Sequence, residues 1–228
     1  MKPSTTIIVP AYNEEKGLPT VLEEIFHILD DNYEVIVVDD GSSDSTSEIA
    51  SNLPCKLIKH EVNKGKGQAL RTGFAQAQGE KIIWIDADGT YPVQFIPKMA
   101  EELNIYDIVV CSRRYGRENI PRFNRIGNWL FRVLIQGFYG YQAFDPCSGL
   151  YGAKKYHLDM MRLSSSRFAI EPEISMKAGR MKLKTLDIPI EYRNRIGQTN
   201  LNAIVVGFED LFKIMRLLLW RPRHNSGR

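Results

Sequence analysis

The sequence has few cysteines and no long apolar run, and each shortage excludes a class of protein. It holds 3 cysteines in 228 residues, an odd number with no two close together, so neither a disulfide framework nor a zinc cluster is indicated. We expect the thiols to be free in a reducing, cytoplasmic setting. No apolar run approaches the ~20 residues that a bilayer-spanning helix needs, and Met1 leads into a strand pattern without a signal peptide. The sequence therefore predicts a cytoplasmic protein that touches a membrane at most through one face.

A strong net charge is also missing. The formal charge is +3, and charged residues make up 25% of the chain, as in ordinary globular proteins. The basic residues are unevenly placed, because residues 113–132 hold six arginines and one acid, and residues 212–228 hold five basic residues and no acid. Neither cluster accompanies a motif that reads nucleic acid, so nucleic acid is not an expected partner.

The first half of the chain alternates strand and helix signals. Short apolar runs predict strands at 5–9, 33–38, 56–59, 81–86 and 108–111, with helical periodicity between them. Near-continuous apolar strands separated by helices indicate an α/β fold with a mostly parallel sheet covered on both faces. Ligands of such sheets bind beyond the carboxyl ends of the strands.

The second half is less regular. Apolar residues at helical spacing predict an amphipathic helix over 126–138, a strand over 183–192 and a final helix over 201–220. Trp84 and Trp129 are expected in the core. We find no repeat, linker or low-complexity segment, and therefore expect a single domain.

The most informative pattern is the pair of carboxylates Asp86 and Asp88, directly after the apolar run 82–85. Two oxygen ligands at a sheet edge suit a hard divalent cation, which usually also takes water and substrate phosphates. Alone, the pattern also fits a polar turn that ends a strand. Polar and glycine residues at the ends of three other predicted strands favour a nucleotide site. These stretches are Pro10-Ala11-Tyr12-Asn13-Glu14, Asp39-Asp40-Gly41 and Asn63-Lys64-Gly65-Lys66-Gly67.

Taken together and in this order, the blocks 9–14, 37–44, 63–67 and 86–88 resemble family 2 glycosyltransferases. That family has the GT-A fold, a Rossmann-like nucleotide-sugar-binding fold. The later stretches 145–150 and 188–199 are similar to those of dolichyl-phosphate mannose synthases and related polyprenyl-phosphate glycosyltransferases. The chain departs from these synthases at two places, which are Gly89-Thr90 in place of a frequent Leu-Gln, and Thr199-Asn200 in place of Ser-Lys. The missing lysine removes an expected phosphate contact.

The resemblance implies an inverting, metal-dependent transfer of a hexose from GDP-mannose or a UDP-sugar to a polyprenyl or dolichyl phosphate. Asp86 and Asp88 would hold Mg²⁺ or Mn²⁺. Arg195 would grip phosphate oxygens through its planar fork of donors. Asp145, like Glu171 and Glu173, could be a base or a structural carboxylate, and Asp88, Arg195 and Asp145 form the candidate catalytic set. The residues implied for donor binding are Pro10, Tyr12, Glu14, Val37, Asp39, Lys66, Asp86 and Arg113.

The resemblance also implies a division of the chain 1–228. Residues 1–112 would bind the nucleotide sugar, 113–200 would face the acceptor, and 201–228 would form an amphipathic helix with a basic tail. The stretch 201–223 combines apolar and basic residues, which suits either peripheral contact with the cytoplasmic membrane face or packing on the domain.

Three alternatives stay open at this point. The same donor chemistry could serve a soluble or polysaccharide hydroxyl acceptor, which would need a positioned base. A sugar nucleotidylyltransferase would need a glycine- and arginine-rich loop near the N-terminus, which residues 9–17 lack. A non-catalytic sensor of nucleotide sugars would bind the donor without turnover.

Overall fold

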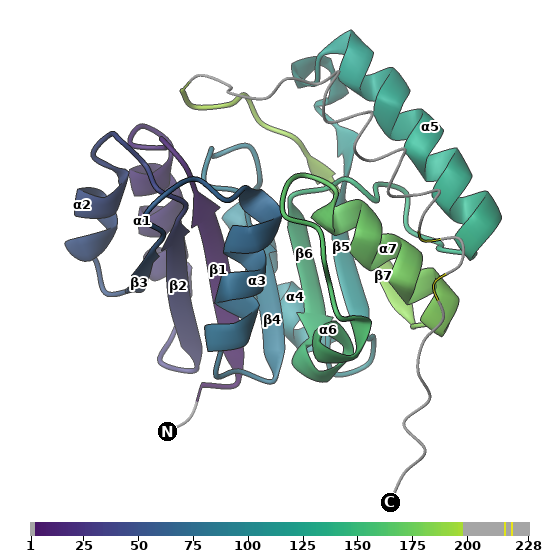
Figure 1. Cartoon of the computed structure of the whole chain (residues 1–228), viewed down its shortest axis with the longest axis horizontal. Coiled ribbons are helices and arrows are strands. Elements are labelled where there is room, and N and C mark those ends of the chain that lie inside the picture. Colours follow the sequence, from purple (N-terminus) through teal and green to yellow (C-terminus); the bar gives the residue numbers. More distant parts are fainter. Residues whose placement is uncertain (1–2, 198–216, 218–219, 221–228) are drawn as a thin grey trace, which may run out of the picture.

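The computed structural model describes residues 3–197 together with residues 217 and 220, and its centre is one mixed β-sheet (Figure 1). The seven strands follow the order β3-β2-β1-β4-β6-β5-β7. Neighbouring strands are parallel except around β6, which is antiparallel to both β4 and β5. The strands are β1 (Thr5–Ala11), β2 (Tyr33–Asp39), β3 (Lys56–Lys59), β4 (Lys81–Ile85), β5 (Ile108–Tyr115), β6 (Leu150–Lys154) and β7 (Thr185–Glu191).

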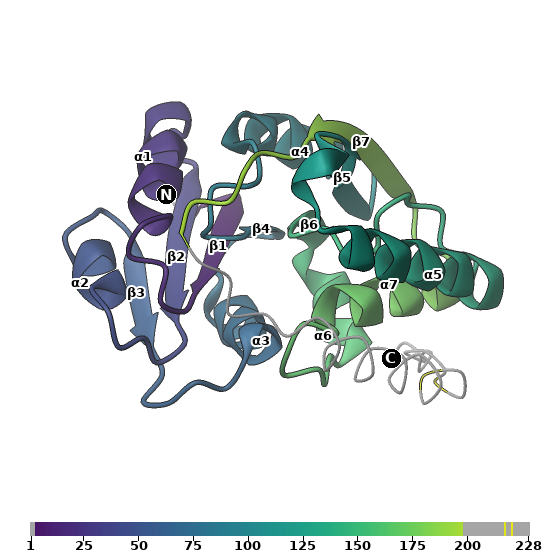
Figure 2. The ribbon, with the colours of Figure 1, turned by 90° about the horizontal axis from the view of Figure 1, so that it is seen from above.

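Helices cover both faces of this sheet, as Figure 2 shows. Side chains of α1, α2 and α4 share one buried cluster with the sheet, whereas α3, α5, α6 and α7 share the other. Alternation along β1 sends Ile7 to the first cluster and Ile8 to the second, because successive strand residues face opposite sides. The helices are α1 (Leu18–Ile28), α2 (Thr46–Ser51), α3 (Lys66–Gln76), α4 (Ile96–Glu102), α5 (Arg122–Tyr139), α6 (Lys155–Met161) and α7 (Ile170–Met181), with 3₁₀ turns η1 (Val93–Phe95) and η2 (Arg117–Asn119).

The mostly parallel α/β fold predicted from the sequence is confirmed. Its one strand absent from the sequence-based prediction is β6, which lies between β4 and β5. β6 is short and contains Gly152, and glycine weakens the strand signal of a sequence. A Cβ at Gly152 would lie 3.1 Å from the side chain of Leu103 and 3.3 Å from that of Ile83, so a larger residue would require these side chains to shift.

The long helix α5 does not follow its sequence-based prediction in one respect. Trp129 was expected in the core, but 54% of its surface is exposed. The buried face of α5 instead uses Phe131, Ile135 and Tyr139, so Trp129 lies on another face of the helix. Trp84, by contrast, is fully buried and stacks on Tyr151, with ring centroids 5.3 Å apart.

Most of the predicted final helix at 201–220 lies outside the described residues. Of that stretch, Leu217 is buried and Trp220 packs against the same cluster as α6 and α7. Within the described part of the chain, no helix combines the length and apolar character that crossing a bilayer requires.

Candidate active site

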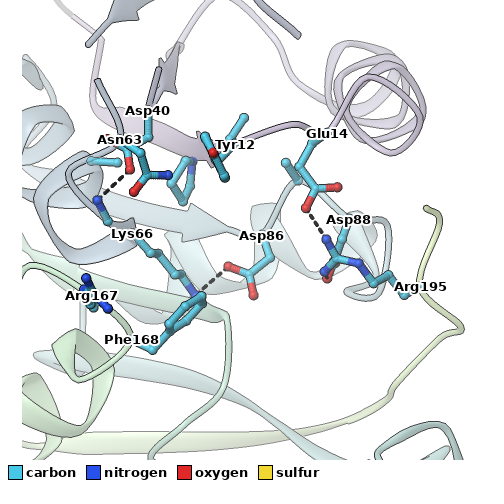
Figure 3. Close-up of a pocket in the computed structure, with 15 residues that line it drawn as sticks. Tyr12, Glu14, Asp40, Asn63, Lys66, Asp86, Asp88, Arg167, Phe168 and Arg195 are labelled. Carbon is cyan, nitrogen blue, oxygen red and sulfur yellow. Dashed lines mark hydrogen bonds and ion pairs between the residues drawn. The ribbon is translucent and has the colours of Figure 1, made fainter. Parts of the chain in front are cut away.

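A cavity of about 380 Å³ opens where β1 and β4 end (Figure 3). This is the sheet edge at which the sequence predicted a nucleotide site, in line with ligand binding beyond the carboxyl ends of parallel strands. Its walls come from both halves of the sequence. The lining residues are Pro10, Ala11, Tyr12, Glu14, Asp40, Asn63, Gly65, Lys66, Ala69, Asp86, Ala87, Asp88, Arg167, Phe168 and Arg195.

The turn after β1 delivers Tyr12 and Glu14 to this cavity. Asn13 between them has a φ of 54°, a left-handed conformation that asparagine adopts more readily than most residues. The turn is tied to the loop after β2, because the Asn13 amide donates to Ser42 Oγ at 2.9 Å and the Glu14 amide donates to Thr46 Oγ1 at 2.9 Å.

Asp86 lies beside a buried lysine. Lys66, at the first position of α3, places its Nζ 2.6 Å from Asp86 Oδ1 and 2.6 Å from Glu171 Oε1. Burial alone would lower the pKa of Lys66, but the two carboxylates outweigh it and raise that pKa. Burial also raises the pKa of Asp86 and of Glu171, and Lys66 opposes both shifts. Lys66 therefore stays charged between two acids, one of which faces the cavity.

Asp88 lies beside an arginine from the far end of the described chain. Its Oδ2 accepts from Arg195 Nη1 at 2.5 Å, and the other terminal nitrogen of Arg195 binds Glu14. The other carboxylate oxygen, Oδ1, accepts from the Thr90 amide at 3.1 Å and from the Thr90 hydroxyl at 2.5 Å. Thr90, one of the two residues that replace the Leu-Gln frequent in the synthases, thus fixes the rotamer of Asp88.

Arg195 reaches the cavity because the segment after β7 runs back across the sheet edge (Figures 1 and 2). The Arg193 amide donates to Thr90 O at 2.9 Å, and the Ile196 amide donates to Asp88 O at 2.9 Å. Arg193 also pairs with Glu24 of α1 at 2.9 Å. These contacts attach residues 193–197 to the backbone that carries the acidic pair.

Gly149, just before β6, makes room for Asp86. A Cβ at Gly149 would overlap Asp86 Oδ2 and would lie 2.8 Å from the Tyr91 ring. Its amide donates to the Tyr91 hydroxyl at 2.6 Å, and its carbonyl accepts from the Asp86 amide at 3.2 Å. No other residue type fits this position without moving Asp86 or Tyr91.

Glu14 has an unusual protonation equilibrium. Burial and the nearby carboxylates of Asp88 and Asp86 raise the pKa of Glu14 to about 7, although Arg195 opposes the shift. The cavity wall around Glu14 therefore has an excess of negative charge when all its acids are ionised.

Seven of the predicted site residues meet in this cavity, and four do not. Val37 and Asp39 are completely buried, and Asp39 accepts from the Ser42 amide at 2.9 Å and from the Ser47 hydroxyl. Arg113 and Asp145 lie elsewhere, in a second, smaller pocket. The residues that meet are Pro10, Tyr12, Glu14, Lys66, Asp86, Asp88 and Arg195.

Arg113 and Asp145 form a tight pair. Arg113 Nε and Nη2 donate to the two oxygens of Asp145 at 2.6 Å and 2.8 Å. Burial would raise the pKa of Asp145, but Arg113 outweighs it and lowers that pKa. Asp145 also accepts from the Cys147 amide at 3.3 Å, which orients the turn before β6.

The sequence-based reasoning missed the lining residues Arg167 and Phe168, and it named Asp40 only as part of the stretch 39–41. Arg167 and Phe168 lie in the loop 162–169 before α7, where they follow three consecutive serines and belong to no motif. Asp40 lines the cavity in place of its neighbour Asp39. Its oxygens accept from His60 Nδ1 at 2.6 Å and from the amides of the loop that precedes Lys66. Only the glutamates downstream of the serines, Glu171 and Glu173, gave a signal in this region.

The carboxylate oxygens at the cavity fit a divalent cation that has few protein ligands. Among the described residues, no group of three or more His, Cys, Asp or Glu side chains is arranged to hold a metal. Mg²⁺ often takes only one or two carboxylates and completes its shell with water and substrate phosphates. Asp86 and Asp88 meet that requirement, provided that Arg195 releases Asp88 Oδ2.

An acidic pair and basic side chains around a cavity at the carboxyl edge of the sheet form the arrangement expected of a ligand-binding α/β protein. The chain belongs to the family described as Glycosyl transferase family 2, whose sequence profile matches residues 6–159. The resemblance inferred from the motifs is thereby confirmed, and the protein is a glycosyltransferase.

Two curated relatives with assigned names align with most of this chain. A dolichyl-phosphate hexose transferase of Haloferax volcanii is 30% identical over 88% of this chain and 88% of its own length. A dolichol-phosphate mannosyltransferase of Pyrococcus furiosus is 31% identical over 94% of this chain and 64% of its own length.

The fold is also similar to that of glucosyl-3-phosphoglycerate synthase from Mycobacterium tuberculosis. Its complex with phosphoglyceric acid has a TM-score of 0.78 at 20% identity, covering 99% of this chain and 83% of that one. Its complex with Mn²⁺, UDP and glucosyl-3-phosphoglycerate has a TM-score of 0.73 at 20% identity, with the same coverage. At this identity the similarity supports the fold alone.

Proposed function

We propose that this protein transfers a hexose from a nucleoside-diphosphate sugar to a polyprenyl phosphate, with a divalent cation held by Asp86 and Asp88. The observation that carries the proposal is the arrangement of this acidic pair with Lys66 and Arg195 around one cavity. Acids alone would repel a diphosphate, and cations alone would not hold a metal. The two together suit a metal-bound diphosphate.

Each side chain has a definite role in this proposal. The cation, when bound, neutralises negative charge on the departing diphosphate. Lys66 contributes a point charge to the phosphate oxygens from its place at the start of α3. Arg195 exchanges Asp88 Oδ2 for phosphate oxygens, which its planar fork can bind in pairs. Pro10 and Tyr12 line the same cavity and would contact the nucleotide.

The relatives support the choice of sugar and acceptor class. The two relatives described above are named for hexose or mannose transfer to dolichyl phosphate. A relative from Trichomonas vaginalis, 27% identical over 96% of this chain, is named a dolichyl-phosphate β-glucosyltransferase. All three names contain a hexose and dolichyl or dolichol phosphate, which is a polyprenyl phosphate. The particular hexose differs among the names that specify one.

The second pocket supports an acceptor that carries a phosphate. Its volume is about 50 Å³, and its lining includes Arg113, Arg117, Arg125 and Arg132. Among the described residues, only Arg113 of these four has a carboxylate partner. Arg117 and Arg132 lie over the ring of Phe144, at 5.7 Å and 4.4 Å from its centroid. The remaining positive charge suits an anion of about the size of a phosphate group.

The exposed face of α5 supports a prenyl chain on that phosphate. Ile126, Trp129, Leu130 and Val133 are 67%, 54%, 44% and 44% exposed, and their spacing places them on one face of the helix. Trp129 also lines the arginine pocket. An apolar stripe beside arginines suits a helix in the interface of an anionic membrane, so α5 would hold the phosphate and its prenyl chain at the cytoplasmic face. Contact through 201–223 stays a further prediction.

This acceptor needs no catalytic base. A phosphate monoester is already an anion near neutral pH, whereas a hydroxyl group would require a positioned base. Asp145 is engaged with Arg113 through both oxygens. In this proposal Asp145 therefore positions Arg113 at the rim of the arginine pocket and accepts no proton. The reaction is a single displacement that inverts the configuration at the anomeric carbon of the sugar.

A donor and acceptor panel tests the function. GDP-mannose and UDP-glucose are each incubated with a short-chain prenyl phosphate, simple sugars or 3-phosphoglycerate, with Mg²⁺ or Mn²⁺ and then with chelator. We expect cation-dependent transfer to the prenyl phosphate. Transfer that survives excess chelator would contradict the cation, and transfer to hydroxyl acceptors alone would contradict the lipid. Donor binding without any turnover would indicate a sensor.

A membrane-binding measurement tests the α5 surface. Trp129→Ser should reduce co-sedimentation with anionic vesicles and raise KM for the prenyl phosphate. The matched control is Ile105→Ser, because Ile105 is also exposed, at 61%, but lies in the turn between α4 and β5. Equal vesicle binding by both variants would contradict the assignment of α5.

A further inference from the structure

Glu173 is a completely buried carboxylate that the proposed reaction does not use. It lies in the first turn of α7 and accepts from the Ser165 amide at 2.7 Å and from the Ser165 hydroxyl at 2.5 Å. The Ser164 amide donates to the two oxygens of Glu173 at 3.1 Å and 3.2 Å. A buried charge is costly unless it is paired and hydrogen-bonded, and here the amides and hydroxyls of Ser164 and Ser165 in one loop all donate to the carboxylate.

Lys177 completes the environment of Glu173. Its Nζ lies 2.6 Å from Glu173 Oε1 and donates to Met161 O at 2.8 Å and to Arg162 O at 3.1 Å. The ion pair thus joins α7 to the end of α6 and to the residues that open the loop. Removing one member of such a buried pair leaves the other uncompensated.

The opposite side of the same loop is pressed against α3. The Gln68 amide donates to Ser166 O at 2.9 Å. A Cβ at Gly67 would lie 2.6 Å from Ser165 O, and one at Gly65 would overlap Ser166 O. The loop 164–168 is therefore held between Glu173 on one side and the glycines that flank Lys66 on the other.

The next two residues of this loop form part of the cavity wall. Arg167 and Phe168 line the cavity, and Figure 3 places the Phe168 ring beside the side chains of Lys66 and Asp86. The loop has neither helical nor strand hydrogen bonds of its own between residues 163 and 166. Fixing each residue of such a backbone costs conformational entropy, so the position of the loop depends on the contacts at its two sides.

We propose that Glu173 is a positioning residue for the donor, acting through the loop 164–168. By holding Ser164 and Ser165, it places Arg167 near the donor phosphates and the Phe168 ring against the donor sugar. This inference rests on the proposed function, because it assigns the loop to the nucleoside-diphosphate sugar of that reaction. Glu173 touches no reacting atom, so its loss weakens donor binding and leaves the chemical step of bound donor nearly intact.

The test compares variants in the full chain. Glu173→Gln keeps the side-chain shape and removes the negative charge. Glu173→Gln/Lys177→Met also removes the positive charge of Lys177, which the first change would leave without this carboxylate. The matched control is Asp107→Asn. Asp107 likewise accepts from a lysine, Lys154, at 3.0 Å and from a backbone amide, that of Lys184, at 3.0 Å, but it precedes β5, at the sheet edge opposite the cavity.

Binding of UDP and GDP is measured by calorimetry with Mn²⁺, and donor KM and kcat are measured with the prenyl phosphate. Because hydrogen bonds to charged groups contribute more than those between neutral groups, we expect both Glu173 variants to raise Kd and donor KM about tenfold or more. The value of kcat should change less than about threefold. Hydrogen exchange at the Ser165 amide should become faster, and Glu173→Asp should restore part of the donor affinity. Asp107→Asn should leave donor KM and this exchange unchanged.

Three results would overturn the inference. If wild type binds a nucleoside diphosphate and folded Glu173→Gln binds it equally well, the positioning role is wrong and the proposed function stands. If wild type binds neither UDP nor GDP, the proposed donor is wrong, and the positioning role falls with it. A loss of kcat at unchanged donor KM would also contradict a role in donor positioning.

Discussion

Arg195 Nη1 donates to Asp88 Oδ2 at 2.5 Å, although 107 residues separate the two in the sequence. The other end of the guanidinium binds Glu14. Arg195 thus neutralises two acids of a cavity that the proposed reaction fills with a cation and a diphosphate. A cation held by Asp88 would compete with Arg195 for this carboxylate, and the exchange would free Arg195 for the phosphates.

Substitution of Asp88 tests the cation site. Asp88→Asn keeps an oxygen for the Thr90 amide but removes the charge, so we expect turnover to fall about 100-fold or more. The thermal midpoint should stay near that of wild type, since Arg195 keeps Glu14 as a partner. Turnover with Mn²⁺ and circular dichroism are the measurements. Full activity in a folded Asp88→Asn protein would contradict the metal assignment.

Substitution of Arg195 tests its fork geometry. Lysine carries the same charge but cannot bridge two carboxylates or two phosphate oxygens with a planar group. We expect Arg195→Lys to lower kcat/KM about tenfold or more, since hydrogen bonds to charged groups contribute about 1.5–3 kcal/mol. Arg195→Ala should be more severe. Equal activities of wild type and both variants would remove Arg195 from the site.

Gly149→Ala tests the space that the structure gives to Asp86. The added methyl group would overlap Asp86 Oδ2, so we expect weaker Mn²⁺ binding and lower turnover. Mn²⁺ affinity is measured by electron paramagnetic resonance. Gly137→Ala is the control, because a Cβ at Gly137 meets nothing within 4 Å and alanine favours a helix by about 1 kcal/mol. Unchanged Mn²⁺ affinity in Gly149→Ala would contradict the role of Asp86.

The raised pKa of Glu14 predicts a pH dependence of stability in chelator. Burial raises the pKa of this carboxyl from 4.5 to about 7, so between these values the folded chain binds more protons than the unfolded chain. The contribution of Glu14 to the free energy of unfolding therefore falls as pH rises through this window. Thermal unfolding of Glu14→Gln should show a flatter pH profile than wild type. Parallel profiles would contradict the assigned shift.

The sequence predicted the strands of the first half well because their apolar runs are fully buried. Ile82 to Ile85 have no exposed surface, and such runs contrast sharply with the polar residues that follow. The signal failed for β6, whose glycine and short length reflect its place between two strands that lie far from it in the sequence. The prediction that Trp129 is buried failed for a related reason, since periodicity identifies a helix face but does not say what covers it.

The site was predictable where strand ends carry polar residues, and less so elsewhere. Asp39 and Asp40 are adjacent, yet only Asp40 lines the cavity. Neighbouring residues in extended chain point to opposite faces, and the cavity opens on the face covered by α3. Nothing in the sequence identifies that face. The loop of Arg167 and Phe168 gave no pattern either, because its position depends on contacts with α3 and α7.

By itself, the sequence determined the α/β class, the edge of the sheet at which the cavity opens and the acidic pair Asp86 and Asp88. A short stretch of consecutive residues is enough to predict a buried strand and the position where it ends. Parallel strands then bring their carboxyl ends together. The tertiary structure alone decided that Arg195, Lys66 and Glu171 pair around those acids, and that Arg113 and Asp145 lie in a separate pocket. Contacts between distant segments depend on packing across the sheet, which no short stretch of sequence encodes.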